Sequence, residues 1–129
     1  MRSPEDLKVL LAEDNVVNQR MMKLIFSKLK VNVDIADDGK IAFEMYQNKA
    51  YDLIFMDVQM PVLDGVESTK LIREYEKTSG SLNKALIIAL SGSELSQNMD
   101  LCSEIGWDDF IEKPVRVEIL HKYISKLIE

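Results

Sequence analysis

Three short apolar runs constrain the fold of this chain more than any other feature. Residues 9–12, 53–56 and 85–90 are continuously apolar. Runs of this length suit strands that are buried on both faces, as in a parallel sheet. Residues 31–35 alternate between apolar and polar, as in a strand with one wetter face, and residues 109–112 are short and flanked by charge. We therefore predict three central strands and two edge strands.

Helical patterns lie between and after these runs. The last one places its apolar residues at i, i+3, i+4, i+7 and i+8, at Leu120, Tyr123, Ile124, Leu127 and Ile128. A similar stripe predicts the apolar face of the first helix, with Val17, Met21, Leu24, Ile25 and Leu29. Further patterns run from about residue 41 to 46, from 66 to 75 and from 95 to 105. Gly106 is well placed to end the fourth helix in a left-handed conformation.

Strand and helix therefore alternate five times, which predicts a parallel sheet with right-handed crossovers and helices on both faces. Central strands one, three and four with edges two and five match the order 2-1-3-4-5. This is the doubly wound, flavodoxin-like (βα)5 fold of the α/β class. The 129 residues fit one domain, 1–129, and no interdomain linker is visible. In such sheets ligands bind beyond the carboxyl ends of the strands, between strands one and three.

Composition excludes several classes of partner. The formal net charge of −6 argues against direct binding of nucleic acid, which needs clustered Lys and Arg. The single cysteine, Cys102, rules out an intramolecular disulfide and favours a reducing compartment. No apolar run approaches the roughly 20 residues that cross a bilayer, and the first residues lack a signal-peptide core. We expect a cytoplasmic protein with no membrane partner.

Polar side chains follow the central strands at the points where these strands end. Glu13 and Asp14 follow the first, Asp57 the third and Ser91 the fourth, while Lys113 follows the fifth. Carboxylates about 5 Å apart would repel by about 3 kcal/mol per pair at an effective dielectric near 20. A hard divalent cation with oxygen ligands removes this conflict, and Mg²⁺ suits a site of few carboxylates, waters and phosphate oxygens.

Each of these signals has an ordinary structural explanation when taken alone. Asp14-Asn15 can cap the first helix, a serine after a strand is common, and a Lys-Pro pair is an ordinary turn. Together, at four strand ends, they favour a phosphoryl site strongly.

The combination of motifs resembles the receiver domain of two-component response regulators. The resemblance rests on Glu13-Asp14, Asp57-Val58-Gln59-Met60-Pro61-Val62-Leu63-Asp64-Gly65, Ser91-Gly92 and Lys113-Pro114. It spans nearly the whole chain. Leu11-Ala12-Glu13-Asp14-Asn15 and the start of the Asp57 motif are closest in wording to receivers of hybrid histidine kinases.

The resemblance implies a role for each of these residues. Asp57 would be the phosphorylated nucleophile. Asp14 would ligate Mg²⁺ directly, Glu13 directly or through water, and Gln59 through its backbone carbonyl; Mn²⁺ is an alternative ion. The partner would be a histidine kinase or a histidine phosphotransfer protein whose phosphohistidine donates to Asp57. The domain would be a monomer or a weak dimer linked to phosphorylation.

Three further residues would respond to the phosphoryl group. Lys113 would pair with the Asp57 carboxylate and then with phosphoryl oxygens, and Ser91 would donate a hydroxyl hydrogen bond. Phe110 matches the aromatic residue whose rotamer reports phosphorylation, here through packing alone. The surface of the fourth helix, fifth strand and fifth helix would change. The Lys113–Pro114 peptide bond is expected to be cis, as in the family.

Other readings of the same site are weaker. A haloacid dehalogenase-type phosphatase needs a second aspartate two residues after the nucleophile, where this chain has Gln59. A flavin-binding module needs a phosphate loop after the first strand, where Glu13-Asp14-Asn15 would repel phosphate. A receiver relic that no longer takes phosphate conflicts with the full acidic site. We therefore expect a signalling phosphoacceptor and not a turnover enzyme.

The remaining conspicuous residues are given structural roles. Met21 and Met22 are expected to fill the core, Cys102 to be buried and inert, and Trp107 to pack before the fifth strand. His121 is expected to lie on the surface.

Overall fold

The computed structural model describes residues 3–60, 62–80, 84–92 and 103–128. It contains a parallel five-stranded sheet in the order β2-β1-β3-β4-β5. The strands are β1 (Val9–Ala12), β2 (Val33–Ala36), β3 (Leu53–Asp57), β4 (Leu86–Ser91) and β5 (Asp109–Glu112). The helical elements are η1 (Pro4–Asp6), α1 (Val16–Lys28), α2 (Gly39–Asn48), α3 (Gly65–Thr78) and α5 (Val117–Ile128). The predicted flavodoxin-like order is confirmed.

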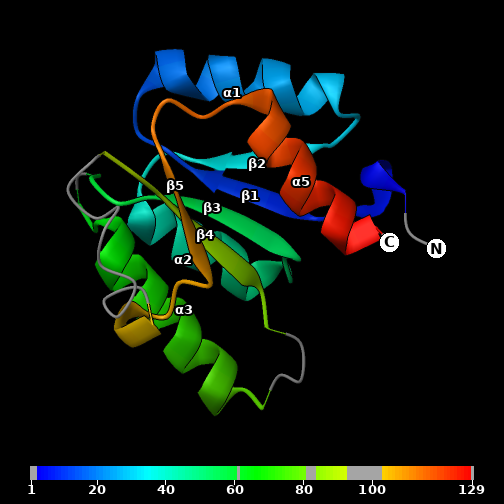
Figure 1. Ribbon diagram of the computed structural model, residues 1–129. Coiled ribbons are helices and arrows are strands. Elements are labelled where there is room, and N and C mark those ends of the chain that lie inside the picture. The colour runs from blue at the N-terminus through cyan, green and yellow to red at the C-terminus, as the bar shows by residue number, and fades with distance from the viewer. Residues whose placement is uncertain (1–2, 61, 81–83, 93–102, 129) are drawn as a thin grey trace.

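Helices cover both faces of the sheet. Figure 1 shows α1 and α5 on one face and α2 and α3 on the other. The α2–α3 side buries Leu10 and Ala12 of β1, whereas the α1–α5 side buries Val9 and Leu11. This two-sided burial explains why the central strands read as continuous apolar runs.

The prediction for the buried face of α1 was partly wrong. Val17, Met21 and Leu24 are 65%, 54% and 65% exposed, so Met21 is not part of the core. Met22 and Phe26 face the sheet instead, with 5% and 0% exposed. Apolar residues occupy more than one face of this helix, and spacing alone does not say which face meets the sheet.

Other expectations are confirmed where the structure describes the residue. Trp107 is buried, and its indole Nε1–H donates to Thr69 Oγ1 at 2.9 Å. Gly106 has a φ of +110°, His121 is exposed, and the Lys113–Pro114 bond is cis. Cys102 and most of the expected fourth helix lie outside the described residues.

The first turns of three helices point toward the carboxyl edge of the sheet. Side-chain oxygens of Asn15, Asp38 and Asp64 accept the backbone N–H groups that open α1, α2 and α3. Since Asn15 caps α1, the Asp14 carboxylate is not needed as the cap.

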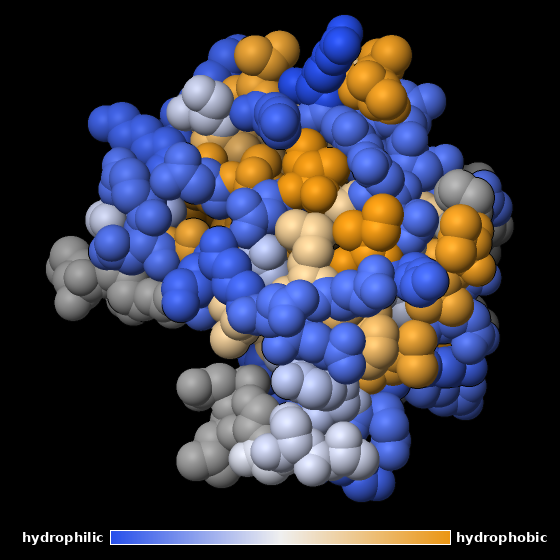
Figure 2. Space-filling model, turned by 180° about the vertical axis from the view of Figure 1, so that it is seen from behind, coloured by the Kyte–Doolittle hydropathy of each residue, from blue (hydrophilic) through white to orange (hydrophobic). Residues whose placement is uncertain are grey.

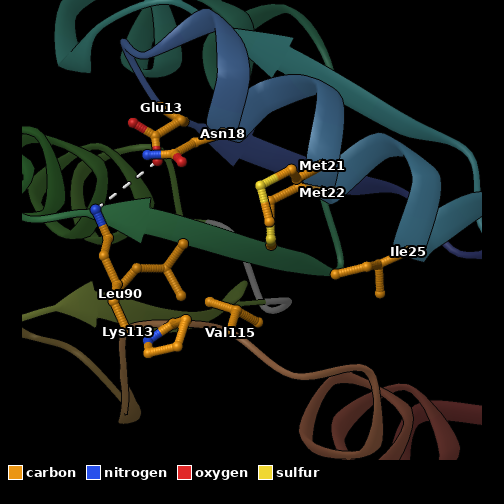
Figure 3. Close-up of a pocket in the computed structure, with 9 residues that line it drawn as sticks. Glu13, Asn18, Met21, Met22, Ile25, Leu90, Lys113 and Val115 are labelled. Carbon is orange, nitrogen blue, oxygen red and sulfur yellow. Dashed lines mark ion pairs between the residues drawn. The ribbon is translucent and has the colours of Figure 1, made fainter.

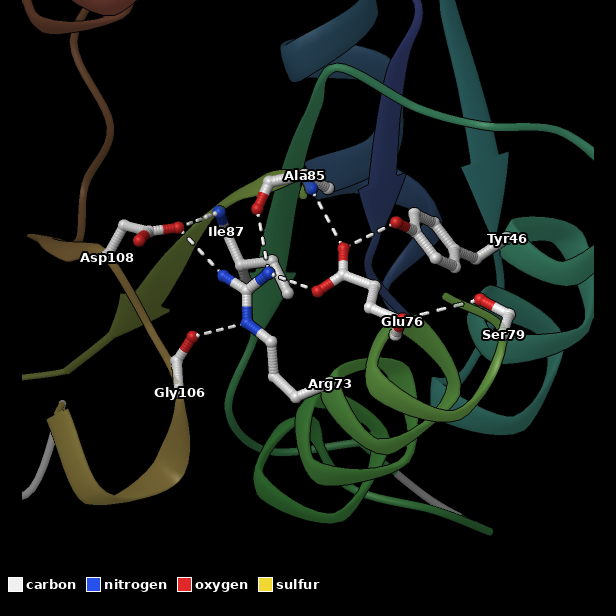
Figure 4. Close-up of polar contacts among 8 residues, drawn as sticks. All are labelled: Tyr46, Arg73, Glu76, Ser79, Ala85, Ile87, Gly106 and Asp108. Carbon is white, nitrogen blue, oxygen red and sulfur yellow. Dashed lines mark hydrogen bonds and ion pairs between the residues drawn. The ribbon is translucent and has the colours of Figure 1, made fainter. Parts of the chain in front are cut away.

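A buried charged cluster holds the opposite end of the molecule together (Figure 4). The Glu76 side chain is 1% exposed and lies 2.8 Å from Arg73 Nη1. Glu76 also accepts from the Tyr46 hydroxyl and from the Ala85 N–H. Arg73 donates in turn to the backbone carbonyl oxygens of Gly106 and Ala85, at 2.9 Å each. The cluster therefore ties α2 and α3 to the segments that enter β4 and β5.

Among the described residues, no helix combines the length and the apolar character needed to cross a bilayer.

Candidate functional site

The carboxyl ends of β1 and β3 bring three carboxylates together. Glu13 directly follows β1 and Asp57 ends β3, and the register pairs Ala12 with Met56. One carboxylate oxygen each from Glu13, Asp14 and Asp57 lies within 4.8 Å of the others. Glu13 and Asp57 are 2% and 4% exposed, whereas Asp14 is open to solvent. The predicted acidic residues therefore share one pocket.

Lys113 supplies positive charge to this pocket. Its Nζ lies 3.0 Å from Asp57 Oδ1 and 3.8 Å from Glu13 Oε1. The Lys113 backbone N–H donates to the carbonyl of Ser91 at 2.8 Å, which fixes the residue beside the end of β4. One ammonium group faces three carboxyl groups, so an excess of negative charge remains if all are ionised.

The environment of Glu13 disfavours its ionised form. Burial, followed by a hydrogen bond with Asp57, raises the pKa of Glu13 to about 7. The backbone N–H of Asn15, 3.2 Å from Glu13 Oε2, acts in the opposite direction, as does the charge of Lys113. Ionising Glu13 in this pocket therefore costs free energy.

Ser91 has an unusual hydroxyl group. It is the last residue of β4 and only 2% exposed, and its Oγ finds no hydrogen-bond partner among the described residues. A buried polar atom without a partner is uncommon and destabilising. This hydroxyl is therefore available to an oxygen that enters the pocket.

The donor atoms of the pocket fit a hard divalent cation. Carboxylate oxygens are the ligands that Mg²⁺ prefers, and the excess negative charge calls for a cation. A hollow of about 440 Å³ opens on the solvent side, lined by Asp14, Val58, Gln59, Met60 and Asp64. The Gln59 N–H donates to Asp57 Oδ1 at 3.3 Å, so the predicted Gln59 backbone also lies beside the carboxylates.

Phe110 lies apart from the acidic residues. It sits in β5 opposite Ala89 of β4, half-buried, and packs against the core on the α2–α3 side. Of the predicted site residues, Glu13, Asp14, Asp57, Gln59, Ser91 and Lys113 surround the ends of β1, β3, β4 and β5.

Two features of the site were missed in the sequence. Gln19 of α1 donates Nε2 to the carbonyl of Glu13 and to Asp37 Oδ1, which ties two turns of the pocket together. A groove of about 350 Å³ also runs from Glu13 and Lys113 between α1 and the segment before α5 (Figure 3). Its apolar lining comes from Met21, Met22, Ile25, Leu90, Pro114 and Val115. Neither feature has a signal in the sequence, because a single glutamine and a pair of methionines form no recognisable motif.

Comparison with known proteins places the chain in a family. The family model of the response regulator receiver domain matches residues 9–125. Hybrid signal transduction histidine kinases F and K of Dictyostelium discoideum are each 38% identical to it, over 95% and 98% of this chain. The aligned region is only 11% of each of these two proteins, so the chain spans about a tenth of their length.

Two similar solved structures are receiver domains. One is the receiver domain of the Saccharomyces cerevisiae response regulator Ssk1, in complex with the histidine phosphotransfer protein Ypd1. It is 33% identical with a TM-score of 0.88, covering 99% of this chain and 92% of that one. The other is the receiver domain of the Pseudomonas aeruginosa sensor histidine kinase PA1611, with a magnesium ion in its active-site cleft. It is 32% identical with a TM-score of 0.81, covering 95% and 97%. This chain belongs to the response regulator receiver domain family of two-component signalling proteins.

Proposed function

We propose that this chain accepts a phosphoryl group on Asp57 from a phosphohistidine. The observation that carries the proposal is the Asp57 carboxylate at the end of β3, which has acidic neighbours on one side and Lys113 Nζ at 3.0 Å. A carboxylate oxygen of Asp57 forms a bond to phosphorus while the bond between phosphorus and the histidine nitrogen breaks. The imidazole leaves with the bonding electron pair, and an acyl phosphate results.

The neighbouring residues hold the reacting charge. Lys113 stays near the oxygens of Asp57 and offsets the charge that the phosphoryl group brings. The Ser91 hydroxyl donates to a phosphoryl oxygen and so gains its missing partner. Glu13, Asp14, Asp57 and the Gln59 carbonyl would hold Mg²⁺ or Mn²⁺. When bound, such an ion neutralises the carboxylates and the transferred phosphoryl oxygens.

The chain is a signalling acceptor in this proposal and not a turnover phosphatase. A phosphatase that uses an aspartyl phosphate needs a positioned acid or base beside the nucleophile. Gln59, two residues after Asp57, carries an amide that does not titrate. The chemistry therefore ends at a phosphorylated protein whose surface is read by another.

We infer that the phosphoryl donor is a histidine phosphotransfer protein or a histidine kinase. The donor needs a docking surface beside the pocket, and α1 offers one, with four large apolar side chains in the open: Val16, Val17, Met21 and Leu24. Figure 2 shows apolar side chains along the upper edge of the molecule, where α1 runs in Figure 1. The similar Ssk1 receiver is seen with the phosphotransfer protein Ypd1. We place this exchange in the cytoplasm, with the receiver as a monomer or a weak dimer.

Labelling experiments test the phosphoacceptor. Incubation with acetyl phosphate and Mg²⁺ is expected to give an acyl phosphate that hydroxylamine removes, because Asp57 is the nucleophile. Asp57→Asn should abolish the label, and Asp14→Ala should weaken both Mg²⁺ binding by calorimetry and labelling. Asp38→Asn, which alters an acidic cap outside the carboxylate cluster, is the matched control and should label normally. Label that persists in Asp57→Asn, or that is acid-labile and base-stable, would refute the assignment.

We propose further that phosphorylation alters the surface around the fourth helix, β5 and α5. Drawing the Ser91 hydroxyl toward the phosphoryl group vacates space beside β4, and Phe110 fills it by becoming more buried. Moving a population from 1:99 to 99:1 needs about 5.5 kcal/mol of differential interaction. One charge-assisted bond to Lys113 supplies about 1.5–3 kcal/mol, so Ser91 and Phe110 must contribute as well. The switch stays incomplete unless these three contributions together reach about 5.5 kcal/mol, and we expect an incomplete switch.

Replacing Phe110 tests this output. Phe110→Ala is expected to accept phosphate normally yet lose phosphorylation-dependent partner binding, because the aromatic ring that responds to Ser91 is gone. Phe43→Ala, which removes another half-buried ring packed on the same core, is the control and should keep that binding. In the wild type, beryllofluoride should shift amide resonances across residues 95–120. Shifts that stay within the acidic pocket would contradict the switch.

A further inference from the structure

Val62 adopts a backbone conformation that is costly for its type of side chain. Its φ is +67°, in the left-handed region, and its side chain is 77% exposed. A β-branched residue is strained there, whereas glycine and asparagine adopt the same region readily. The fold gains little in return, because an exposed side chain buries almost no apolar area.

Backbone contacts hold the loop on both sides of Val62. The carbonyl oxygen of Leu63 accepts the Gly39 N–H at 3.0 Å, and the Gly65 N–H donates to the carbonyl oxygen of Val58 at 2.9 Å. A Cβ on Gly39 would lie 2.1 Å from the Leu63 oxygen, so this contact has no slack. The loop is thus held on both sides of Val62, and Val62 keeps its strained positive φ within this held loop.

The loop also forms the rim of the acidic pocket. Gln59, Met60 and Asp64 line the hollow together with Asp14 from the β1–α1 turn. Asp57 is only 4% exposed, so a protein that brings a histidine to it must press against this rim. A small donor such as acetyl phosphate has no such need.

We propose that Val62 is a docking residue for the protein that donates the phosphoryl group, and that its apolar side chain is buried only in that complex. The inference rests on the proposed function and adds a contact outside α1 to the donor surface. The occupant is a phosphohistidine protein with an apolar patch beside its histidine. The contact that Val62 makes in the complex thus offsets the backbone strain that it has in the free domain.

Three variants separate strain from docking. Val62→Asn and Val62→Gly relieve the positive φ and remove the apolar contact, while Val62→Ile keeps a branched apolar side chain. The first two are expected to melt several degrees higher than the wild type and to label with acetyl phosphate within twofold of its rate. Phosphotransfer from phosphorylated Ypd1 should slow about tenfold in Val62→Asn, which corresponds to the loss of one buried valine side chain. Val62→Ile should transfer at the wild-type rate.

The outcomes distinguish the two proposals. Failure of acetyl phosphate to label the wild type would remove the proposed function itself. Normal labelling together with undiminished transfer from phosphorylated Ypd1 to Val62→Asn would overturn the docking role alone. The docking role would also be overturned if phosphorylated Ypd1 transferred nothing to the wild type. It would be overturned as well if Val62→Asn abolished a phosphorylation-linked dimer while transfer persisted. A lower melting temperature in Val62→Asn and Val62→Gly would overturn the strain on which the inference rests.

Discussion

Replacing Arg73 by methionine is expected to lower the free energy of unfolding by about 3–5 kcal/mol, because it leaves the buried Glu76 carboxylate without its counter-charge. The Glu76 side chain is 1% exposed, and its ion pair with Arg73 Nη1 is 2.8 Å long. Methionine keeps an unbranched stem but donates nothing to the carbonyl groups of Gly106 and Ala85. Urea denaturation followed by circular dichroism measures the loss.

A surface ion pair provides the matched comparison. Lys49 Nζ lies 3.0 Å from Asp34 Oδ2, but these side chains are 48% and 42% exposed. Lys49→Met should therefore cost under about 1 kcal/mol. The double variant Arg73→Met with Glu76→Met should recover part of the stability, since no charge then remains buried. Equal costs for Arg73→Met and Lys49→Met would contradict the assigned importance of the buried pair.

Gly65→Ala is expected to cost about 3 kcal/mol or more, at the upper end of overpacking effects. A Cβ at this position would lie 2.2 Å from the backbone oxygen of Asp57 and 2.9 Å from Cα of Val58. Backbone atoms cannot turn aside as a flexible side chain can, so either α3 or the end of β3 must shift. Because that end carries Asp57, labelling by acetyl phosphate should slow as well.

Gly80→Ala separates crowding from the general cost of losing a glycine. Gly80 has a φ of +71°, yet nothing lies within 4 Å of an added Cβ. Its replacement should cost only about 1–2 kcal/mol of backbone strain and leave labelling unchanged. If Gly65→Ala is as stable and as readily labelled as Gly80→Ala, then α3 does not pack on β3 as closely as described.

The sheet could be predicted because its constraints are local in the sequence. Continuous apolar runs identify central strands, and strict alternation with helices leaves few topologies. The buried face of α1 could not be predicted in the same way. Val17, Met21 and Leu24 satisfy the helical spacing as well as Met22 and Phe26 do, and only the packed structure separates them.

The acidic pocket was predictable for a related reason. The ends of adjacent parallel strands share one edge, so Glu13, Asp14 and Asp57 had to converge once the strand order was known. The Arg73–Glu76 pair was not, because its members read as an ordinary charged pair one helical turn apart. The strain at Val62 could not be predicted either. It depends on the contacts that hold both ends of the loop, and residue types alone do not indicate these contacts.

The lone hydroxyl of Ser91 bears on how much work a signal must do. A buried hydroxyl with no partner among the described residues raises the free energy of the resting domain. An arrangement that gives this hydroxyl a partner therefore differs less in free energy from the resting one. In a core whose polar groups were all hydrogen-bonded, this difference would be larger. In the proposed switch, resting stability would be exchanged for ease of activation, a trade that natural proteins often make at functional sites. A sequence optimised for stability alone would remove this hydroxyl and, if the proposed switch operates, would make the domain harder to activate.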